Sequence, residues 1–349
     1  MGIDVGGANT KVAISDVDVF VDTIYAPLWK NNTILYDLLS ELKHKFAAEA
    51  EAVGVVMTGE LCDCFKTKRE GVLHIKNALS CVFGTVKFFD ADCTFKDASE
   101  VDKDPLSVAA TNWLASAKFI SERYNDAIFV DIGSTTTDVI PIVGGEIKAK
   151  RTDFERLKSG ELIYSGILRT NIATLLKKVE IGTECKTSSE LFAITADVYT
   201  VLGYLKESDY SCETPDSHAF VGQQKYEKSR TSAMRRLSRV VCCDLEELKE
   251  DSVVSISEQV KEVQIAELVA SLEKIKEKYR LKTVVSAGIG DLIIAKEAAE
   301  SLNLQFLSLS SIYGKKISAA FPAYSVSKLL AQTNHRTQMK VKTHDSKSK

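Results

Sequence analysis

The stretch "FVDIGSTTTDVIPI" (Phe129–Ile142) stops an apolar run, places a glycine and four hydroxyl residues in a row, and then resumes the apolar pattern. Asp131 and Asp138 bracket the hydroxyl residues. A plain surface hairpin would be satisfied by a short Asn-Gly or Asp-Gly turn. The stretch therefore predicts two strands joined by a turn that needs many short polar donors beside a carboxylate.

The same pattern occurs near the start of the chain, in "GIDVGGANTKVAI" (Gly2–Ile14). Both stretches read as strand, Asp-x-Gly, polar turn and strand. When the two are superposed, the matched pairs are Asp4 with Asp131, Gly6 with Gly133, Thr10 with Thr137, and Val12 with Val139. Two such matches, one in each half of the chain, are much harder to obtain by accident than one, so they indicate a duplicated fold with two facing hairpins.

Between and after the hairpins, apolar strands alternate with helical patterns, which is typical of α/β architecture. A third glycine element, "SAGIGD" (Ser286–Asp291), follows a buried strand and precedes a helix. We expect a first domain over 1–104 and a second over 105–310, with a helical insertion at about 155–280. We expect a C-terminal helix over 311–332 to pack back, and the polar residues 333–349 to form a disordered tail.

The composition argues against several classes of protein. The chain has 349 residues, of which 45% are hydrophobic and 27% charged, and its net charge of −3 gives no general electrostatic reason to bind nucleic acid or membranes. No apolar run reaches about 18 residues, so we expect no transmembrane helix. A motif already in the first residues argues against a signal peptide, and the eight cysteines lack zinc-site spacing. We therefore expect a cytoplasmic protein with reduced cysteines, of unknown oligomeric state.

The turns of both hairpins are suited to anions, because small residues leave backbone N–H groups open. Hydroxyl and amide side chains add donors, and Lys11 adds a positive charge suited to phosphate. The predicted diphosphate-binding residues are Gly6, Gly7, Asn9, Thr10 and Lys11 in the first hairpin, and Gly133, Ser134, Thr135, Thr136, Thr137 and Asp138 in the second. Either turn alone could be a plain polar loop, and it is the pair that favours a site.

Asp4 and Asp131 would repel a bare phosphate. They are explained if they hold Mg²⁺ directly or through water, since Mg²⁺ takes one or two carboxylates plus phosphates and keeps several waters. The sequence therefore predicts magnesium at Asp4 and Asp131. The third glycine element, with Gly288, Gly290 and Asp291, would bring a helix N-terminus toward an anion or a nucleoside, although a glycine turn for tight packing is an equally simple reading.

The order of two phosphate turns, connecting helices and a glycine turn resembles the actin, hexokinase and Hsp70 superfamily. This implies two ribonuclease H-like domains around a central ligand cleft. Within that superfamily, the two hairpins resemble the hydantoinase/oxoprolinase-related branch. Further stretches resemble a narrower family of methanofuran biosynthesis and tetrahydromethanopterin-linked one-carbon transfer: "VVMTGELCDCF" (Val55–Phe65), "GELIYSGILRTN" (Gly160–Asn171), "TSAMRRLSRVVCCDLEEL" (Thr231–Leu248) and "SAGIGDLII" (Ser286–Ile294).

The resemblance implies a transferase. The family's methanofuran enzyme joins γ-glutamyltyramine to an aminomethylfuran methyl diphosphate, which forms an aryl ether and releases pyrophosphate. The phenol has a reference pKa near 10, so a base should help. The catalytic candidates are Asp4, Asp131, Glu60 and Asp63, with Asp138 a further possible base, and the sequence does not choose among them.

Glu60 and Asp63 follow a strand end, where they either line the cleft or belong to a solvated charged loop. Glu161, Tyr164 and Arg169 either recognise the glutamyl or aryl end of the substrate or lie on a surface segment. Substrate contacts are also expected at Gly288, Gly290 and Asp291.

Two other functions fit the same motifs. An ATP-dependent amidohydrolase or small-molecule kinase would use the two turns for the tail of ATP, with "SAGIGD" against adenine. An actin-like nucleotide sensor or assembly subunit would need no catalysis. One departure from the superfamily is that only Met1, Gly2 and Ile3 precede Asp4, so the first strand is expected to be about half its usual length.

Overall fold

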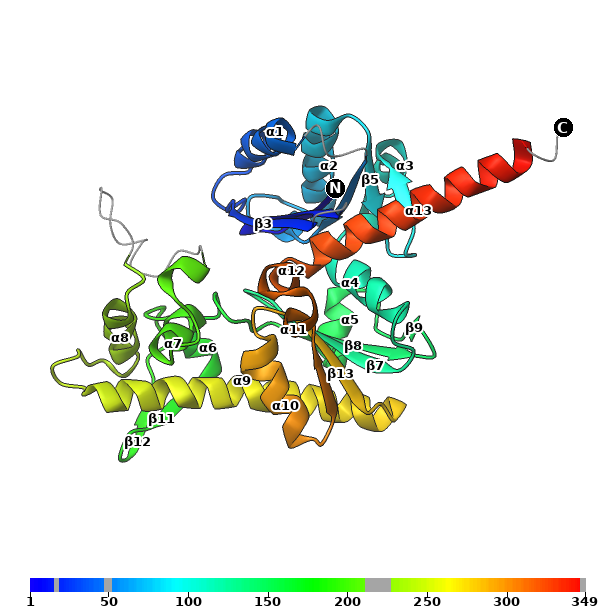
Figure 1. The fold of residues 1–349 in the computed structure, drawn as a ribbon. Helices are drawn as coiled ribbons and strands as arrows, with labels where there is room; N and C mark the ends of the chain where they lie inside the picture. Colours follow the sequence, from blue (N-terminus) through cyan, green and yellow to red (C-terminus); the bar gives the residue numbers. More distant parts are fainter. Residues whose placement is uncertain (16–18, 47–51, 211–226, 346–349) are drawn as a thin grey trace. The chain divides into compact units, whose positions relative to one another are not determined.

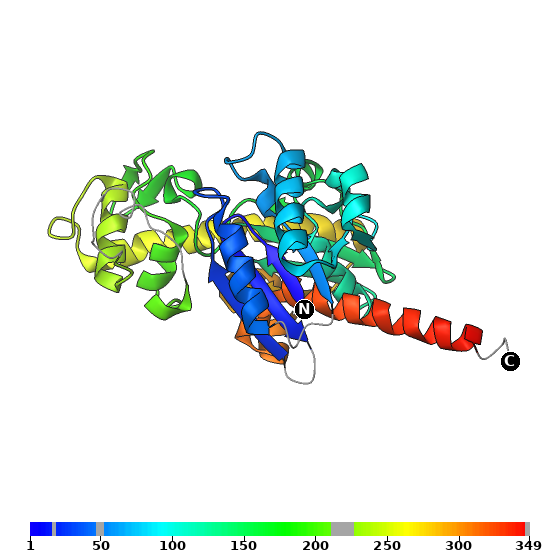
Figure 2. The same ribbon diagram turned by 90° about the horizontal axis from the view of Figure 1, so that it is seen from above.

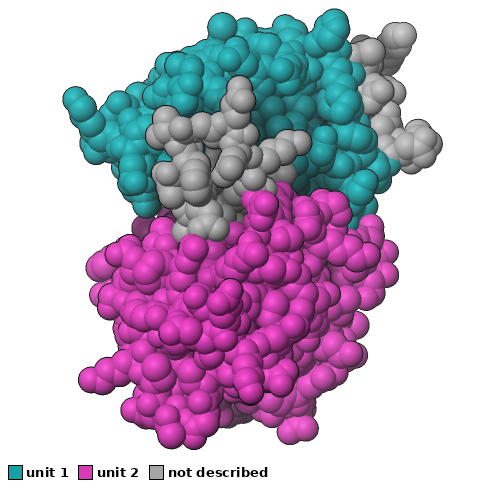
Figure 3. Space-filling view, turned by 90° about the vertical axis from the view of Figure 1, so that its left-hand side faces the viewer, with its two compact units in different colours: residues 1–125, 144–147, 316–349 teal, residues 126–143, 148–315 magenta. Residues whose placement is uncertain are grey.

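The computed structural model describes residues 1–15, 19–46, 52–210 and 227–345. The chain divides into two compact units, coloured separately in Figure 3. Unit 1 contains Met1–Asn125, Gly144–Ile147 and Lys316–Lys349, and unit 2 contains Asp126–Val143 and Lys148–Lys315. Within the described ranges, no helix combines the length and apolar character needed to span a bilayer.

Unit 1 is built on a six-stranded sheet in the order β3-β2-β1-β4-β5-β6. Its strands are β1 (Gly2–Val5), β2 (Asn9–Ser15), β3 (Val19–Tyr25), β4 (Val53–Met57), β5 (Val86–Phe89) and β6 (Phe95–Asp97). The central strand β1 runs antiparallel to β2 and parallel to β4. The helices are α1 (Ile34–Phe46), α2 (Lys68–Phe83), α3 (Ala98–Lys103), α4 (Asn112–Ser121), α12 (Lys315–Ala319) and α13 (Phe321–Asp345), with single 3₁₀ turns at Gly59–Leu61 and Pro105–Val108.

Helices cover both faces of this sheet. The apolar sides of α1 and α2 join the strands in one hydrophobic core, while α13 packs on the other face against β1, β2 and β4. Glycines allow this close packing, because a Cβ on Gly2 would lie 2.1 Å from the carbonyl oxygen of Ala323. Figures 1 and 2 show α13 crossing the sheet and continuing beyond its edge.

The sheet of unit 2 has the strand order β10-β8-β7-β13-β14, with β9 (Glu146–Ile147) also paired to β8. Its strands are β7 (Ala127–Ile132), β8 (Thr137–Val143), β10 (Leu162–Ile163), β13 (Thr283–Gly288) and β14 (Gln305–Ser308). β7 runs antiparallel to β8 and parallel to β13, as β1 does to β2 and β4. The duplicated α/β fold predicted from the two hairpins is therefore confirmed.

The helical part of unit 2 separates β8 from β13 in the sequence. Its elements are α5 (Asp153–Ser159), α6 (Ile172–Leu175), the small hairpin β11 (Lys178–Glu180) and β12 (Glu184–Lys186), α7 (Thr195–Val201), α8 (Arg230–Ser238) and α9 (Glu250–Tyr279), with 3₁₀ turns at Glu207–Asp209 and Arg239–Val241. After β13 come a π turn (Asp291–Ala295), α10 (Lys296–Ser301) and α11 (Leu309–Tyr313). The 30-residue helix α9 links two cores, because its first half packs with α7 and α8 and its second half packs on the sheet (Figure 1).

Two boundaries differ from the sequence-based expectation. The units divide after Asn125 rather than near Pro105, because α4 packs with α13 on the first sheet. Helix α13 continues to Asp345, well into the segment 333–349 that we expected to be disordered. That segment lacks glycine and proline up to Asp345, and extending a packed helix is easier than nucleating a new one.

Candidate functional site

The two predicted hairpins have the same turn. In unit 1 the backbone N–H of Gly6 donates to the carbonyl oxygen of Asn9 at 3.0 Å. In unit 2 the N–H of Gly133 donates to the carbonyl oxygen of Thr136 at 2.9 Å. The flanking strands pair in the same register on both sides. The two matching sequence stretches therefore form structurally equivalent four-residue turns, one in each unit.

The first hairpin places a carboxylate opposite a lysine. Asp4 is 3% exposed and pairs across the strands with Lys11, whose Nζ lies 4.0 Å from Asp4 Oδ2. Thr10 is fully buried, and its hydroxyl has no hydrogen-bond partner among the described residues. Buried hydroxyls normally have a partner, so Thr10 retains hydrogen-bonding capacity next to the turn.

Positions 6 and 7 of the first turn require glycine, because neighbouring atoms lie too close to the turn backbone for a Cβ. A Cβ on Gly7 would lie 2.7 Å from the sulfur of Cys62, and a Cβ on Gly6 would lie 2.7 Å from the carbonyl oxygen of Asn9. From the same segment as Cys62, a Cβ on Gly59 would lie 3.2 Å from the carbonyl oxygen of Gly6. The segment that follows β4 therefore supports this turn closely from one side.

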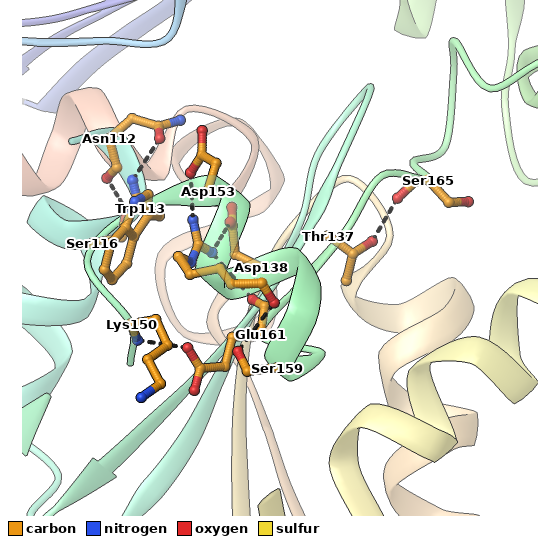
Figure 4. A network of polar contacts seen from close by, with 11 residues as sticks. Asn112, Trp113, Ser116, Thr137, Asp138, Lys150, Asp153, Ser159, Glu161 and Ser165 are labelled. Carbon is orange, nitrogen blue, oxygen red and sulfur yellow. Dashed lines mark hydrogen bonds and ion pairs between the residues drawn. The ribbon is translucent and has the colours of Figure 1, made fainter. Parts of the chain in front are cut away.

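The second hairpin carries the row of hydroxyl residues. Ser134, Thr135 and Thr136 are half-buried, and the hydroxyls of Ser134 and Thr135 lie 3.4 Å apart. Thr137 is buried, and its hydroxyl donates to the carbonyl oxygen of Ser165 at 2.8 Å (Figure 4). Three hydroxyls are thus partly accessible at the turn, while that of Thr137 fastens the turn to the loop after β10.

Two carboxylates face each other across the second hairpin. Asp131 pairs directly with Asp138 on the neighbouring strand, an arrangement that is destabilising when both carry charge. Asp138 accepts a hydrogen bond in a buried ion pair with Arg156, whose side chain is 1% exposed. The same guanidinium donates to Asp153 Oδ1 at 3.2 Å (Figure 4). Arg156, from helix α5, thus balances Asp138, which occupies the position that Lys11 has in the first hairpin.

The three residues expected to recognise the substrate lie in different surroundings. Glu161 is 3% exposed, and its carboxylate accepts from the backbone N–H of Lys150 at 2.6 Å. Tyr164 is 66% exposed. Arg169 is half-buried, and its backbone N–H donates to the carbonyl oxygen of Ser134 at 3.0 Å. Of the three, Tyr164 and Arg169 are reached by solvent, while the buried Glu161 holds the backbone of the segment after β9.

The third glycine element lies next to the second hairpin. Gly288 has a φ of +90°, and a Cβ there would lie 2.6 Å from Asp131 Oδ1 and 2.2 Å from the carbonyl oxygen of Ile132. The backbone N–H of Gly290 donates to the same carbonyl oxygen at 3.2 Å. Unit 2 therefore brings the backbone of Gly288 against the carboxylate of Asp131.

A second internal match was missed at the sequence level. "TGEL" (Thr58–Leu61) follows β4, and "IGDL" (Ile289–Leu292) follows β13, which is the equivalent strand of unit 2. The acids are buried in both cases, Glu60 at 1% and Asp291 at 3% exposed. Asp291 Oδ2 accepts from the hydroxyl of Ser308 at 2.7 Å. The sequence signal for this match is a Gly-acid-Leu triplet after a buried strand in each half of the chain. Asp63 lies after the first triplet and is exposed.

Sequence analysis also missed the residues that hold the second turn from behind. A Cβ on Gly166 would lie 2.6 Å from the backbone nitrogen of Thr135, so only glycine fits there. The backbone N–H groups of Ile167 and Leu168 donate to the carbonyl oxygens of Gly133 and Ser134, both at 3.0 Å. These residues lie within "GELIYSGILRTN" (Gly160–Asn171), where no local pattern marks Gly166 as a packing contact.

The carboxylates of the two hairpins are the candidate metal ligands. Within the part of the chain that the structure describes, no three or more His, Cys, Asp or Glu side chains form a group that could hold a metal ion. Magnesium needs only one or two carboxylates when water and phosphate supply the remaining oxygens. Asp4 in unit 1 and Asp131 in unit 2 are carboxylates at the base of equivalent turns, so their chemistry fits such an ion.

Comparisons with known proteins show which family the chain belongs to. The family model described as hydantoinase/oxoprolinase matches residues 51–336 of this chain. A protein of Methanocaldococcus jannaschii is 39% identical over 334 residues, which cover 95% of this chain and 97% of that one. It is described as the synthase of a furan-2-yl methanamine that carries a γ-L-glutamylaminoethyl-phenoxymethyl group. A Methanococcus vannielii protein of the same description is 38% identical over 61% of this chain and 95% of its own.

Among solved structures, a ROK family glucokinase from Streptomyces griseus in complex with glucose and AMPPNP is similar, with 11% identity and a TM-score of 0.48. The likeness covers 94% of this chain and 97% of that one. On the family match, which spans most of the sequence, and on the identity to a full-length relative, the chain belongs to the hydantoinase/oxoprolinase family.

Proposed function

We propose that this protein is a transferase of methanofuran biosynthesis. It would join the phenol of γ-glutamyltyramine to the methyl carbon of an aminomethylfuran methyl diphosphate, forming an aryl ether and releasing pyrophosphate. The observation that carries the proposal is the 39% identity to the Methanocaldococcus jannaschii synthase, over 95% of this chain and 97% of that protein. The name of that synthase contains both the phenoxymethyl link and the γ-glutamyl group.

The chemistry of the hairpin turns supports a diphosphate substrate. When the C–O bond to the diphosphate breaks, the furan-methyl carbon becomes cation-like and negative charge develops on the leaving group. Donors held in place before the reaction stabilise such charge without reorganising. The half-buried hydroxyls of Ser134, Thr135 and Thr136, with Lys11 of the equivalent turn, are donors of this kind.

We propose that magnesium binds with the diphosphate, held through Asp4 and Asp131. When bound, this ion would add positive charge that stabilises the leaving pyrophosphate. Asp138 is a weaker candidate for direct contact with phosphate, because its carboxylate is already in an ion pair with Arg156. Its role in the proposal is to fix the second hairpin.

The candidate bases differ in their surroundings, and Asp131 keeps 8% of its surface exposed. Glu60 is 1% exposed, whereas Asp63 lies at the surface. Asp131 lies beside both the hydroxyl turn and the backbone of Gly288. We therefore propose that Asp131 is the carboxylate that acts on the substrates and that the phenol of γ-glutamyltyramine binds on its side of the turn.

The test is a reaction of the purified protein with both substrates and magnesium, followed by mass spectrometry of the product and assay of pyrophosphate. The proposal expects the aryl ether and pyrophosphate in equal amounts, and neither when one substrate is omitted. The variant D131N should lose at least about 100-fold in rate, as is usual for a charge-stabilising group. Hydrolysis of ATP without ether formation would instead support an ATP-dependent amidohydrolase or kinase.

A further inference from the structure

A loop packs behind the turn of the second hairpin, residues 133–136, which we call the hydroxyl turn. The loop, residues 165–169, donates three backbone hydrogen bonds to the turn: from Ile167 to Gly133, and from Leu168 and Arg169 to Ser134, all at 3.0 Å. It also accepts one, from the hydroxyl of Thr137 to the carbonyl oxygen of Ser165. Because the carbonyls of Gly133 and Ser134 and the hydroxyl of Thr137 are all bonded to the loop, its position constrains where the turn lies.

The loop is in turn held by one glutamine from helix α9. Gln264 is 4% exposed, and its side-chain N–H₂ group donates to the hydroxyl of Ser165 at 2.6 Å and to the carbonyl oxygen of Gly166 at 3.1 Å. Its side-chain oxygen accepts from the hydroxyl of Tyr199 at 2.7 Å. Ser165 and Gly166 are about 100 residues from Gln264 in sequence, with separations of 99 and 98.

The orientation of this amide is fixed by its partners. The carbonyl of Gly166 can only accept, so it requires the N–H₂ end of Gln264. The oxygen end then faces Tyr199, whose hydroxyl must donate. Burial raises the pKa of Tyr199 well above its usual value, so this hydroxyl remains protonated and a donor at neutral pH. The Tyr199–Gln264–loop chain is therefore a buried network with a single arrangement, the kind that rigidifies its surroundings.

From this network we propose that Gln264 is a positioning residue for the hydroxyl turn of unit 2. It acts through Ser165 and Gly166 to hold the donors of Ser134, Thr135 and Thr136 in place for the diphosphate. The inference rests on the proposed function only for the identity of that anion. Its structural part, that Gln264 orders the turn, is separately measurable.

The chain provides a matched control on the same helix. Gln259 also bonds the backbone of a residue far away in sequence, accepting from the N–H of Glu180 at 2.8 Å and donating to its carbonyl oxygen at 2.9 Å. Glu180 belongs to the hairpin β11–β12, which has no part in the proposed site. The variants Q264M and Q259M therefore each remove one buried or half-buried glutamine link from α9, and only Q264M affects the loop behind the turn.

The first experiment measures binding of pyrophosphate with magnesium by calorimetry and amide hydrogen exchange at Ser134–Thr136. In Q264M the dissociation constant should rise about tenfold, the cost of one unmet buried hydrogen bond, and exchange at the turn should accelerate. In Q259M the dissociation constant should stay within about twofold of wild type. A folded Q264M protein with wild-type affinity would overturn the positioning role, and wild-type exchange at Ser134–Thr136 would overturn the claim that Gln264 orders the turn.

Two further variants separate positioning from general destabilisation. In Q264E the ionised carboxyl cannot donate to Gly166, whereas its protonated form can, so the affinity ratio of variant to wild type should improve between pH 8 and pH 5.5. G166A should weaken pyrophosphate binding at least tenfold, because its methyl group would meet the backbone of Thr135. A pH-independent ratio for Q264E would count against the amide as the positioning group.

The outcomes also distinguish this inference from the proposed function. If wild-type protein binds pyrophosphate and Q264M binds equally well, the positioning role fails and the proposed function stands. If wild-type protein binds no pyrophosphate, the proposed function fails, together with the ligand part of this inference. Unchanged hydrogen exchange in Q264M would remove the remaining structural part.

Discussion

Replacing Arg156 by methionine should destabilise unit 2 by about 4 kcal/mol. The guanidinium is 1% exposed and forms an ion pair with Asp138, whose side chain is 11% exposed. Removing one partner of a buried pair leaves an uncompensated charge and typically costs about 3–5 kcal/mol. The second contact, to Asp153, adds little because that side chain is 31% exposed and water screens it. The repulsion between Asp138 and Asp131 then acts without a counter-charge.

The assay must report on unit 2. Both tryptophans, Trp29 and Trp113, lie in unit 1, so tryptophan fluorescence would follow the other unit. Amide hydrogen exchange of β7 and β8 in increasing urea measures the free energy of opening of the second hairpin directly. The double variant R156M/D138N should lose less than R156M alone, because the neutral amide leaves no buried charge.

The matched control is R230M, which removes an ion pair between Arg230 and Glu250 whose side chains are 47% and 59% exposed. It should cost less than about 1 kcal/mol, as exposed pairs do. If folded R156M opens with a free energy within about 1 kcal/mol of wild type, or if D138N fails to relieve its loss, Arg156 does not balance the two carboxylates and the reasoning is refuted.

Three further predictions follow from single contacts. Tyr199 donates to Gln264 in the folded state, so Y199F should be less stable than wild type by about 1 kcal/mol at pH 8. Burial raises the pKa of Tyr199 in the folded state, so the wild-type advantage is present below about pH 10 and should be lost by about pH 11. Urea unfolding of both proteins at pH 8 and pH 11 measures this. G71A should lower the stability of unit 1 by about 1–3 kcal/mol in thermal unfolding, because its Cβ would lie 2.2 Å from the carbonyl oxygen of Glu60. The control N77A, at an exposed position of the same helix, should be neutral or slightly stabilising because alanine has the better helix propensity. Equal effects of the two variants would contradict the close contact at Gly71. D131N should weaken the magnesium dependence of pyrophosphate affinity, because Asp4 would be the one remaining proposed carboxylate ligand. Calorimetry with and without the ion measures this, and an undiminished dependence would remove Asp131 from the metal site.

The hairpins could be predicted from sequence because their signal is local. Strand periodicity, a glycine at the start of each turn and an aspartate two residues earlier all lie within about a dozen residues, and the structure pairs them accordingly. The duplication added a second, independent observation. Strand pattern, turn residues and internal duplication therefore all indicated the same fold, which makes such a prediction dependable.

The supporting residues could not be predicted, because their partners are distant in sequence. Gln264 is one polar residue on a long helix, and nothing near it in the sequence indicates that it lies against Ser165. Arg156 lies in a charged segment that resembles a solvated helix, yet it is fully buried. The pairing of Asp138 with Arg156 rather than with a phosphate depends on α5 folding back onto β8, which no local pattern encodes.

The packing of α13 on the first sheet has a consequence for biosynthesis. Gly2 and Gly54 lie against residues of α13, and Lys328 donates to the carbonyl oxygen of Ser15, a contact between residues 313 positions apart. On the ribosome, β1 and β2 emerge before unit 2, but the helix that covers one of their faces emerges after it. Until then that apolar face stays open to solvent or to a chaperone. Unit 1, although it contains the first strands of the chain, can therefore complete its folding only after unit 2 has been synthesised.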